Sequence, residues 1–450
     1  MNLRISGRWL LLPLILCGTA VAQNFSGDAR KIGMGGIGNS GSIAQNMAGE
    51  RRPYHAIVVP LALIQLVQDR DRFNPDNESF NPLLALEYAT NPLHYVVGRA
   101  PAENLGRFVS DAVNGTVNRD LNAYRGSIPV NELLTEGLAA PSWGKTFRIV
   151  QRKDGAFHGL YAGAGPYLSL RTDLNIDPRL TDVLSSATPV PIPNRTFTIA
   201  NATNAQAALA LTGGYRGRIP FPGRTSAGKA SREGIYLGAD FHYLRGFLYQ
   251  NADTHLRLDT DANGLLTILP AVTPLVIDYL DSRSGSGLAI DLGLAAVIDK
   301  WELGFGVNGI ANRILWHDPA LKRYTLESLI LGMDVLSQNL PGPPAEIRTE
   351  LPVNYTGSGA FHLGTWTMVA EVSHGFQKID FHGGIERRLG IIDLRGGARY
   401  WLERWHPTGG IGVNLGRRFS VDVAAFGTST NIERQLRPAL AVSLRFNRSR

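Results

Sequence analysis

The chain has 450 residues, which is enough for several small domains or one large barrel. Glycine accounts for 50 of them, whereas charged residues make up only 18%, below the usual quarter. The formal net charge of +7 comes from scattered arginines without a basic run, which argues against a nucleic-acid-binding surface. A barrel that faces lipid outside and a crowded lumen inside needs few charges and many glycines. The composition therefore favours that class over a soluble enzyme.

Residues 1–22 are typical of a secretory signal peptide. Arg4 and Arg8 form a basic region, an apolar run follows over 9–22, and residues 20–22 give a small-x-small cleavage site. The only cysteine, Cys17, lies inside this segment, and the bulky residue before it does not fit a lipoprotein cleavage site. The apolar run is too short for a spanning helix. We expect a mature chain that reaches an oxidising compartment without disulfides, as suits a bacterial barrel.

Residues 23–50 form a glycine-rich segment that we expect to be irregular. Gly33, Gly35 and Gly38 match a dinucleotide-binding fingerprint, but no strand precedes them and no helical pattern follows, so we disfavour that interpretation. We predict instead a compact N-terminal hatch, whose glycines let the backbone pack closely against a barrel wall. The residues assigned to the hatch are Gly33, Gly35, Gly36, Gly38, Asn46 and Gly49.

Alternating polar and apolar residues between turn signals predict an all-β, antiparallel transmembrane barrel over residues 51–446, with 447–450 as a tail. The pattern gives about 14 strands, and an even number fits a bacterial single-chain barrel. The predicted strands span 54–63, 146–152, 158–170, 206–218, 234–244, 287–298, 301–312, 346–355, 360–373, 379–387, 391–402, 408–415, 419–426 and 439–446.

The connections alternate in length. Short turns are expected at 153–157, 299–300, 356–359, 388–390 and 416–418, and long loops at 64–145, 171–205, 245–286, 313–345 and 427–438. Short periplasmic turns with long outer loops are the outer-membrane pattern, from which the links 219–233, 374–378 and 403–407 depart. Short helices are expected at 81–88 and 130–134, within the 64–145 insertion, and at 326–333. These apolar loop segments either form a capture groove or cover one another.

The polar faces of the strands would line the lumen, because a charge facing hydrocarbon costs about 2–4 kcal/mol at the midplane. The side chains expected to point inward are Asp240, His242, Asp291, Glu302, Asn308, Glu371, Asp380, His382, Glu386, Asp393, Arg395, Arg399, Asp422 and Arg445. Six of them, Asp380, His382, Glu386, Arg395, Arg399 and Asp422, would form a polar network. That network either stiffens the barrel or lets the headgroup of an amphipathic cargo pass.

Aromatic residues fall where the borders of a membrane-spanning barrel would lie. Trp143, Trp301, Trp366, Tyr400 and Trp405 stand near predicted strand ends. Such positions are typical of the aromatic girdles of outer-membrane barrels.

Several glycine motifs occur in a fixed order. Residues 29–36 read Ala-Arg-x-x-Gly-Met-Gly-Gly, residues 46–49 read Asn-Met-Ala-Gly, and the glycine-rich strand motifs 382–386, 394–399 and 408–412 follow. This order resembles that of the FadL-type outer-membrane proteins, over roughly residues 28–50 and 359–446. Family members usually carry Asn-Pro-Ala-Gly, so Met47 departs from the pattern and puts the bend in doubt. The resemblance implies a 14-stranded barrel that transports long-chain fatty acids or other hydrophobic compounds; related barrels serve type IX secretion and conjugation.

Other candidate chemistry is sparse. Asp259, Asp261 and Asn263 match the first half of a calcium loop, but Pro270 stands where a bidentate Glu belongs. We expect a turn there, with a weak surface calcium site as the alternative. No histidine pair at metal spacing and no serine nucleophile elbow occurs in the sequence, so no cofactor and no enzymatic activity are expected.

The sequence therefore predicts passive uptake of hydrophobic or amphipathic small molecules across the outer membrane. The alternative is a non-conducting barrel that acts as a binding or scaffold component of a secretion or conjugation apparatus. Expected partners are outer-membrane lipid, a hydrophobic cargo and, through the C-terminal strand ending at Phe446, the barrel-assembly machinery. A kink in a strand near the hatch would favour transport, because lateral exit of a lipid-like molecule needs a break in the ladder.

Overall fold

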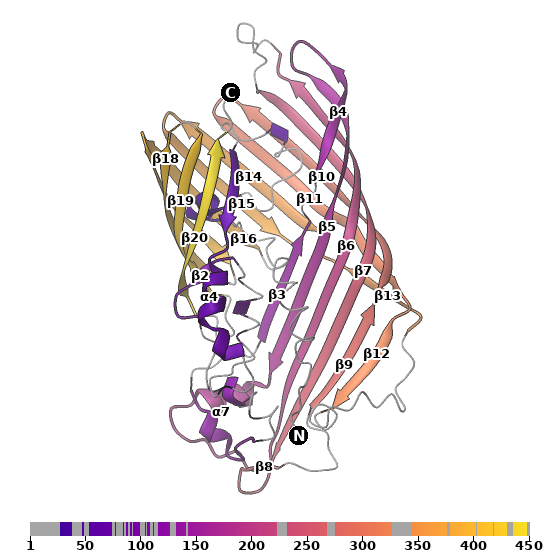
Figure 1. Ribbon diagram of the computed structural model, residues 1–450, viewed down its shortest axis with the longest axis vertical. Helices are drawn as coiled ribbons and strands as arrows, with labels where there is room; N and C mark the ends of the chain where they lie inside the picture. Colours follow the sequence, from indigo (N-terminus) through magenta and orange to yellow (C-terminus); the bar gives the residue numbers. More distant parts are fainter. Residues whose placement is uncertain are drawn as a thin grey trace.

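The protein folds as one large antiparallel sheet of 20 strands, seen here in a computed structural model (Figure 1). The structure describes residues 28–37, 47–48, 54–73, 77, 84, 87–88, 91, 93–99, 104, 106–108, 111, 116–126, 132–140, 143–222, 232–267, 275–325, 344–375, 379–401, 403–416, 418–429 and 435–447. The sheet curls strongly about its long axis, so it has a concave and a convex face (Figure 1). Among these residues, no helix has the length and apolar character needed to cross a membrane.

The C-terminal strands are short, and each pairs with the next in chain order. They are β14 (Asn354–Leu363), β15 (Trp366–His374), β16 (Asp380–Leu389), β17 (Ile392–Trp401), β18 (Arg404–Leu415), β19 (Phe419–Thr428) and β20 (Arg437–Asn447). The outer edge of β20 pairs with β1 (Tyr54–Val59) and, further along, with β2 (Tyr95–Val96).

The middle strands are much longer. Three of them, β5 (Phe157–Ile176), β6 (Thr196–Pro220) and β7 (Gly234–Thr260), form continuous ladders with one another. The remaining strands pair around them: β3 (Glu132–Ala139), β4 (Trp143–Gln151), β8 (Leu266–Thr267), β9 (Leu275–Ser282), β10 (Ser284–Ile298), β11 (Trp301–His317), β12 (Ala320–Thr325) and β13 (Glu346–Glu350).

Several of these segments lie in series beside one partner. Both β3 and β4 pair with β5, all three of β8, β9 and β10 pair with β7, and both β13 and β14 pair with β11. The pairings of the described residues run from β3 and β4 at one edge to β1 and β2 at the other, and no ladder among them joins these two edges.

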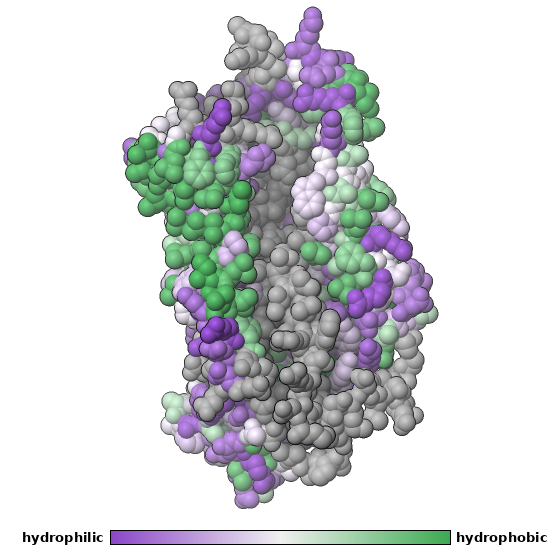
Figure 2. Space-filling view, in the orientation of Figure 1, coloured by the Kyte–Doolittle hydropathy of each residue, from purple (hydrophilic) through white to green (hydrophobic). Residues whose placement is uncertain are grey.

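The two ends of the sheet differ. We call the end that carries the links 152–156, 299–300, 364–365, 390–391 and 416–418 the turn end, and the opposite end the loop end. Large apolar side chains are exposed on the convex face of the half nearest the turn end, among them Leu211, Phe241, Phe305 and Phe381. Figure 2 shows apolar surface over β18, β19 and β20, whereas hydrophilic residues prevail toward α7 (Pro178–Ser185).

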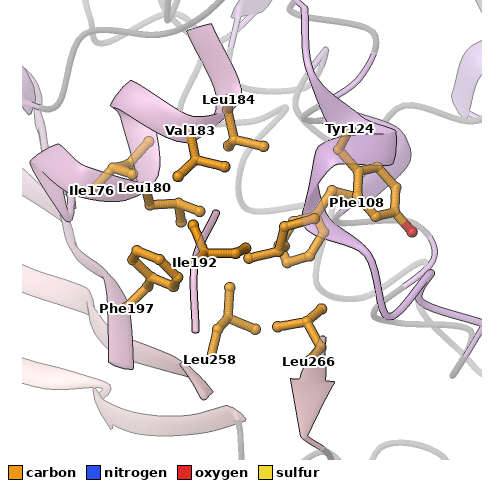
Figure 3. Packing of buried hydrophobic residues seen from close by; sticks show 11 residues of the cluster. Phe108, Tyr124, Ile176, Leu180, Val183, Leu184, Ile192, Phe197, Leu258 and Leu266 are labelled. Carbon is orange, nitrogen blue, oxygen red and sulfur yellow. The ribbon is translucent and has the colours of Figure 1, made fainter. Parts of the chain in front are cut away.

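A separate apolar core lies at the loop end, beyond that half (Figure 3). It joins α7 and the short helix η2 (Leu121–Tyr124) to the far ends of β6 and β7, and it consists of Phe108, Leu121, Tyr124, Ile176, Leu180, Val183, Leu184, Ile192, Phe197, Leu258 and Leu266. The Tyr124 hydroxyl donates to Asp111 at 2.7 Å, and burial together with that carboxylate raises the pKa of Tyr124. We call this cluster the outer core.

Two of the short helices begin at an aspartate whose side chain caps them. Asp28 accepts the Arg30 amide before α2 (Ala29–Gly33), and Asp177 does the same for α7 with Pro178 in the first turn. The helix α4 (Ala62–Gln68) is held by Gln65, whose amide donates to Val96 O at 2.6 Å and accepts from Val96 N at 2.8 Å. The 3-10 helix η1 (Arg70–Phe73) follows it.

Some sequence predictions are wrong in detail. The strand predicted at 54–63 ends at Val59, because Pro60 cannot continue a ladder and α4 begins at Ala62. Of the helix predicted at 130–134, the described residues 132–134 belong instead to β3, because their backbone pairs with β5. The segment 23–50, predicted irregular, contains α2. Of the helix predicted at 81–88, the described positions 84, 87 and 88 are helical. The helix predicted at 326–333 and the signal peptide lie outside the described residues.

Strand boundaries also differ. The turn predicted at 356–359 lies inside β14, and the chain reverses instead at Gly364, where φ is +57°. Glycines 357 and 359 are strand residues against Val372 and Leu303 rather than turn residues. The predicted loops 171–205 and 245–286 contain long extensions of β5, β6 and β7, because the ladders continue through residues that resemble loop residues in composition.

Candidate functional site

The N-terminal segment lies on the concave face of the C-terminal strands. Its helix α2 contacts β17, β18, β19 and β20. Ala29 and Ile32 pack with Ala424, Phe426 and Ala441 in one buried cluster. The predicted hatch residues Gly33 and Gly35 therefore face the sheet, as expected for close packing of backbone on backbone.

Glycine is required on both sides of this contact. Gly35 has φ of +88°, and a Cβ there would lie 2.7 Å from Gly383 O and 2.8 Å from Ala398 O. On the sheet, a Cβ at Gly384 would lie 2.4 Å from Met34 O, and one at Gly397 would lie 2.7 Å from Gly35 N. Real Cβ atoms do not approach backbone so closely, so these glycines let the segment lie directly on the strands.

Three hydrogen bonds hold the same turn of the segment. The Gly35 amide donates to Thr408 Oγ1 at 3.0 Å, and that hydroxyl donates to Gly33 O at 3.3 Å. His382 Nδ1 donates to Gly35 O at 2.6 Å. Gly384, Gly397 and Thr408 lie opposite one another on three adjacent strands, so we call these residues, with Gly410, the glycine seat.

The start of the segment is held by polar side chains of β1 and β20. The Tyr54 hydroxyl donates to Asp28 Oδ2 at 2.5 Å, and the Ser443 hydroxyl donates to Asp28 Oδ1 at 3.3 Å. The Ala29 amide donates to Ser443 Oγ at 3.2 Å. The cap of α2 is therefore also an attachment to the last strand.

A buried ion network joins the segment to the sheet. Arg30 donates from two nitrogens to Glu386, at 2.8 and 3.1 Å. Glu386 also accepts from Arg395 at 2.8 Å and from Arg388 at 2.9 Å. Because Glu386 keeps two arginine partners of its own, the sheet can satisfy this carboxylate without Arg30.

The network continues along the concave face. Arg395 contacts Asp422 at 2.8 Å and Asp393 at 3.2 Å, and Arg445 contacts the same two carboxylates at 3.0 and 2.8 Å. All of these side chains are buried. Alternating charges in this arrangement compensate one another inside the protein, where an unpaired charge would be costly.

A second part of the N-terminal segment contacts a different region of the sheet. Met47 and Ala48 pack against Tyr236, Ala295 and Val297, on β7 and β10. Arg232 donates to Ala48 O at 3.0 Å. The described parts of the segment thus contact the concave face at two places, one on the C-terminal strands and one on the middle strands.

The six residues predicted to form one polar network do not form a single network. Glu386, Arg395 and Asp422 belong to the ion network with Arg30. Asp380 and Arg399 interact electrostatically with each other, and His382 binds the N-terminal segment instead. All fourteen side chains predicted to point inward are buried or half-buried. Gly36 has φ of +81°, whereas Gly38, Asn46 and Gly49 lie outside the described residues.

Sequence reasoning missed the residues that connect the hatch motif to the strands. These are Asp28, Arg30, Tyr54, Thr408 and Ser443. Arg30 stands inside the quoted glycine motif, and its charge is opposite to that of Glu386. A buried cation in a segment predicted to lie against a polar lumen was the one signal that could have indicated the pair.

The calcium candidate folds as a turn. Asp261 Oδ1 accepts the backbone amides of Asn263 at 2.8 Å and Leu265 at 3.0 Å. Asp259 accepts from Arg257 at 2.9 Å and from Thr196 at 2.5 Å. Within the described ranges, no group of three or more His, Cys, Asp or Glu side chains is placed to hold a metal ion. The expected turn is therefore present at Asp261, and the calcium alternative stays untested.

One strand contains a pronounced break in its ladders. The register of β11 against β10 shifts twice between Leu288 and Leu292, and Gly309 and Ala311 have φ of +77° and +53°. On its other side, β11 pairs with β14 up to Asn308 and with β13 only from Arg313. The Gly309 amide donates instead to Asp291 Oδ1 at 2.7 Å. β11 therefore carries a kink between Asn308 and Arg313, whereas a kink near the hatch stays a prediction.

No family model matches the chain, and no curated protein matches it. Solved structures that it resembles include the Ralstonia pickettii toluene transporter TbuX, at 11% identity over 75% of this chain and 93% of that chain, with a TM-score of 0.28. A Pseudomonas aeruginosa FadL homologue is 12% identical over 75% of this chain and 92% of that chain, with a TM-score of 0.30. The Pseudomonas putida toluene transporter TodX is 11% identical over 70% of this chain and 87% of that chain, with a TM-score of 0.27. At TM-scores below 0.5 these likenesses carry no argument about fold or function.

Proposed function

We propose that this chain is an outer-membrane barrel for the passive uptake of hydrophobic or amphipathic small molecules, with residues 23–50 as a displaceable hatch. The observation that carries the proposal is the buried ion pair between Arg30 and Glu386. Arg30 is the contribution of the N-terminal segment to an ion network that Arg388 and Arg395 already satisfy from the sheet. When the hatch leaves, Arg30 enters water and the sheet keeps its charges paired.

The strand pairings support a barrel with 14 strand positions around its wall. Segments that lie in series beside one partner share a position, which groups β1 with β2, β3 with β4, β8 with β9 and β10, and β13 with β14. β11 and β12 also share a position, because they pair with β10 and β9, which already share one. The other nine strands each have a position of their own. Closure would join the free edges of β1 and of β3 with β4, and closed barrels leave no backbone edge facing lipid.

The convex face supports a location in the outer membrane. β15, β16 and β17 hold 9, 10 and 10 residues, the length that a tilted strand needs to cross the hydrocarbon core. Their outward side chains include Met368, Phe381 and Leu394, all exposed. Trp143, Trp301 and Trp405 are exposed near strand ends, as in an aromatic girdle. Outer-membrane lipid and the barrel-assembly machinery stay predicted partners.

The test uses two adjacent glycines of β17 with opposite surroundings. A Cβ at Gly397 would lie 2.7 Å from Gly35 N, whereas nothing lies within 4 Å of a Cβ at Gly396. We expect Gly397→Ala and deletion of residues 24–50 each to raise uptake of a neutral naphthylamine dye into liposomes several-fold, while Gly396→Ala behaves like the unaltered chain. Folding is checked for each variant by its heat-modifiable mobility on gels.

The same assay separates transport from the scaffold alternative. A non-conducting barrel would give the same low dye uptake for the unaltered chain, the deletion and Gly397→Ala, all in folded form. That result would overturn the proposed function, whatever the binding properties of the loops.

A further inference from the structure

A second closed region lies on the concave face, away from the hatch. It consists of buried side chains from β3, β5, β6, β7, β10 and β11, which we call the belt: Leu138, Tyr167, Ala208, Ala210, Leu244, Tyr249, Ala289, Ile314 and Trp316. Leu280, Ile347 and Leu351 pack against it. The proposed hatch mechanism uses none of these residues.

Two hydrogen bonds cross the concave face at the belt. Asn312 of β11 donates to the Tyr167 hydroxyl of β5, and Thr349 of β13 donates to Gln206 of β6 at 2.7 Å. The path along the sheet from β5 to β11 passes through β6, β7 and β10, and the path from β6 to β13 passes through β7, β10 and β11. Four strand spacings amount to about 19 Å. Because direct hydrogen bonds join strands that far apart along the sheet, opposite parts of the concave face are in contact at the belt.

Small residues make this approach possible. The Trp316 ring lies against Gly246 and Gly285, where a Cβ would be 2.6 Å from ring carbons. On its other side the ring stacks on Tyr249, with centroids 5.4 Å apart, and its Nε1 donates to Thr349 Oγ1 at 3.0 Å. Trp316 has no exposed surface, so the belt is filled by the wall's own side chains.

The kink in β11 positions the crossing residue. Asn312 follows Gly309 and Ala311, whose positive φ values insert extra residues opposite β10. Bulges of this kind redirect a side chain. Asn312 is 5% exposed and reaches the hydroxyl of Tyr167 across the concave face.

The belt and the hatch contact lie at different depths. β7 begins at the turn end with Gly234, and its third residue, Tyr236, contacts Met47 and Ala48 of the hatch segment. Leu244 of the belt lies eight residues further, about 26 Å along the strand. Between them the concave face carries the half-buried His242 and the buried Asp240. A molecule moving from the loop end would meet the belt before the hatch.

We propose that the belt is a second barrier in series with the hatch and that it determines which class of molecule can pass. It admits uncharged molecules with an apolar body and one or two hydrogen-bonding groups, and it excludes ions. The inference rests on the proposed transport function. No belt side chain, and none of Gln206, Asn312 and Thr349, is charged, so an anion would lose its hydration there without a counter-charge. Asp291 acts electrostatically on Tyr167, but its carboxylate is already engaged by His242 at 3.0 Å and by the Gly309 amide at 2.7 Å, so a cation would have to compete with these partners. A cargo hydroxyl can replace the Tyr167–Asn312 bond with little net loss.

The experiment compares ion conductance with dye uptake in the full chain and its variants, reconstituted in bilayers. Deletion of residues 24–50 alone should leave potassium chloride conductance at the lipid baseline while dye uptake rises. Adding Trp316→Ala to the deletion should raise conductance at least tenfold. Trp301→Ala is the matched control, because this tryptophan of the same strand is exposed on the convex face and should leave conductance at baseline. If Trp316→Ala gives no folded band, Asn312→Leu replaces it, since it removes the crossing bond and keeps the volume.

Two results would overturn the proposal. One is a hatch deletion that conducts as strongly as the double variant; the other is a folded double variant that stays at baseline. Neither depends on dye uptake, whose failure to respond to the deletion would instead contradict the proposed function. A second measurement tests the cargo class: Tyr167→Phe should lower the uptake of a naphthol relative to naphthalene about threefold, and an unchanged ratio would count against hydroxyl recognition at the belt.

Discussion

The C-terminal strands and the middle strands build the same sheet in different proportions. β15 to β20 hold 9 to 12 residues each, whereas β5, β6 and β7 hold 20, 25 and 27. The short strands carry the glycine seat and the ion network. The long strands carry the apolar convex face only in the half nearest the turn end, where the belt lies on the opposite, concave face, and they carry the outer core beyond that half.

The difference shows that strand length here follows what the concave face has to hold. A strand that only crosses the membrane and supports the hatch needs about ten residues. The additional residues of β6 and β7 include Phe197 and Leu258, which pack with α7 and η2. We therefore expect the outer core to be a separate unit of stability, and the following changes test that expectation.

The largest effect is expected from Glu386→Gln. The change leaves three arginines, two of them buried, without a carboxylate that they share, and breaking such a buried network costs about 3–5 kcal/mol. The free energy of unfolding in detergent should fall by that amount for the whole sheet. Glu346→Gln on the exposed β13 is the control, with an expected change within about 0.5 kcal/mol. Equal effects of both variants would contradict the role of the network.

A local effect of similar size is expected from Phe197→Ala. Phe197 is 1% exposed in the outer core, and removing such a ring costs about 3–5 kcal/mol. Hydrogen exchange should accelerate in α7 and in the far ends of β6 and β7, with β15 to β20 unchanged. Phe147→Ala on the exposed β4 is the matched control. A uniform loss of protection over the whole sheet would show that the two regions do not unfold separately.

The boundary between the lipid-facing half of the sheet and the loop end is tested by substituting one lysine on each side of it. Phe305→Lys faces outward from β11 and should cost about 2–4 kcal/mol in lipid, as a charge near the hydrocarbon midplane does. Thr198→Lys lies on the exposed far end of β6 and should cost much less. Folding into lipid vesicles at increasing urea concentration measures both. A similar loss of stability in both variants would show that the lipid-facing region extends to the loop end.

The smallest effect is expected from pH at the loop end. Arg323 of β12 donates two hydrogen bonds of 2.6 Å to Asp278 of β9 and holds the pKa of that carboxyl below its usual value. Since the folded pKa is lowered, this pair stabilises the β9–β12 contact above the ordinary carboxyl range, and the contribution is lost as pH falls through the folded pKa. Protection of β12 amides should drop in that acid range, and Asp278→Asn should abolish the pH dependence. A variant that keeps it would assign the titration to another group.

The C-terminal strands could be predicted from the sequence because both of their faces are constrained. In β16, Phe381 faces outward and His382 and Glu386 face inward, so the two faces differ in polarity from Asp380 to Glu386. The far half of β6 has no such contrast: residues 196–205 are mostly Thr, Asn and Ala, and the ladder with β7 decides their conformation. The same tertiary pairing, rather than local propensity, makes β3 a strand.

The candidate site could be predicted only in part. Glycines and charges were identified by type and by position within each strand. The partner of Arg30 lies 356 residues away in the chain, and nothing in the local pattern specifies it. The kink that directs Asn312 toward Tyr167 was also invisible, because Ala311 adopts a positive φ that its residue type disfavours.

The hydrogen bond from the Ala29 amide to Ser443 Oγ joins residues 414 positions apart. The residues that receive α2 lie on β16 to β20, which leave the ribosome after the other described strands. The N-terminal segment is therefore made early but has no complete binding surface until the final strands have paired, and contacts of such long range form slowly. Docking of α2 is in this sense the closing step of assembly, so protection of residues 28–35 from proteases would report that the last strand has reached its place.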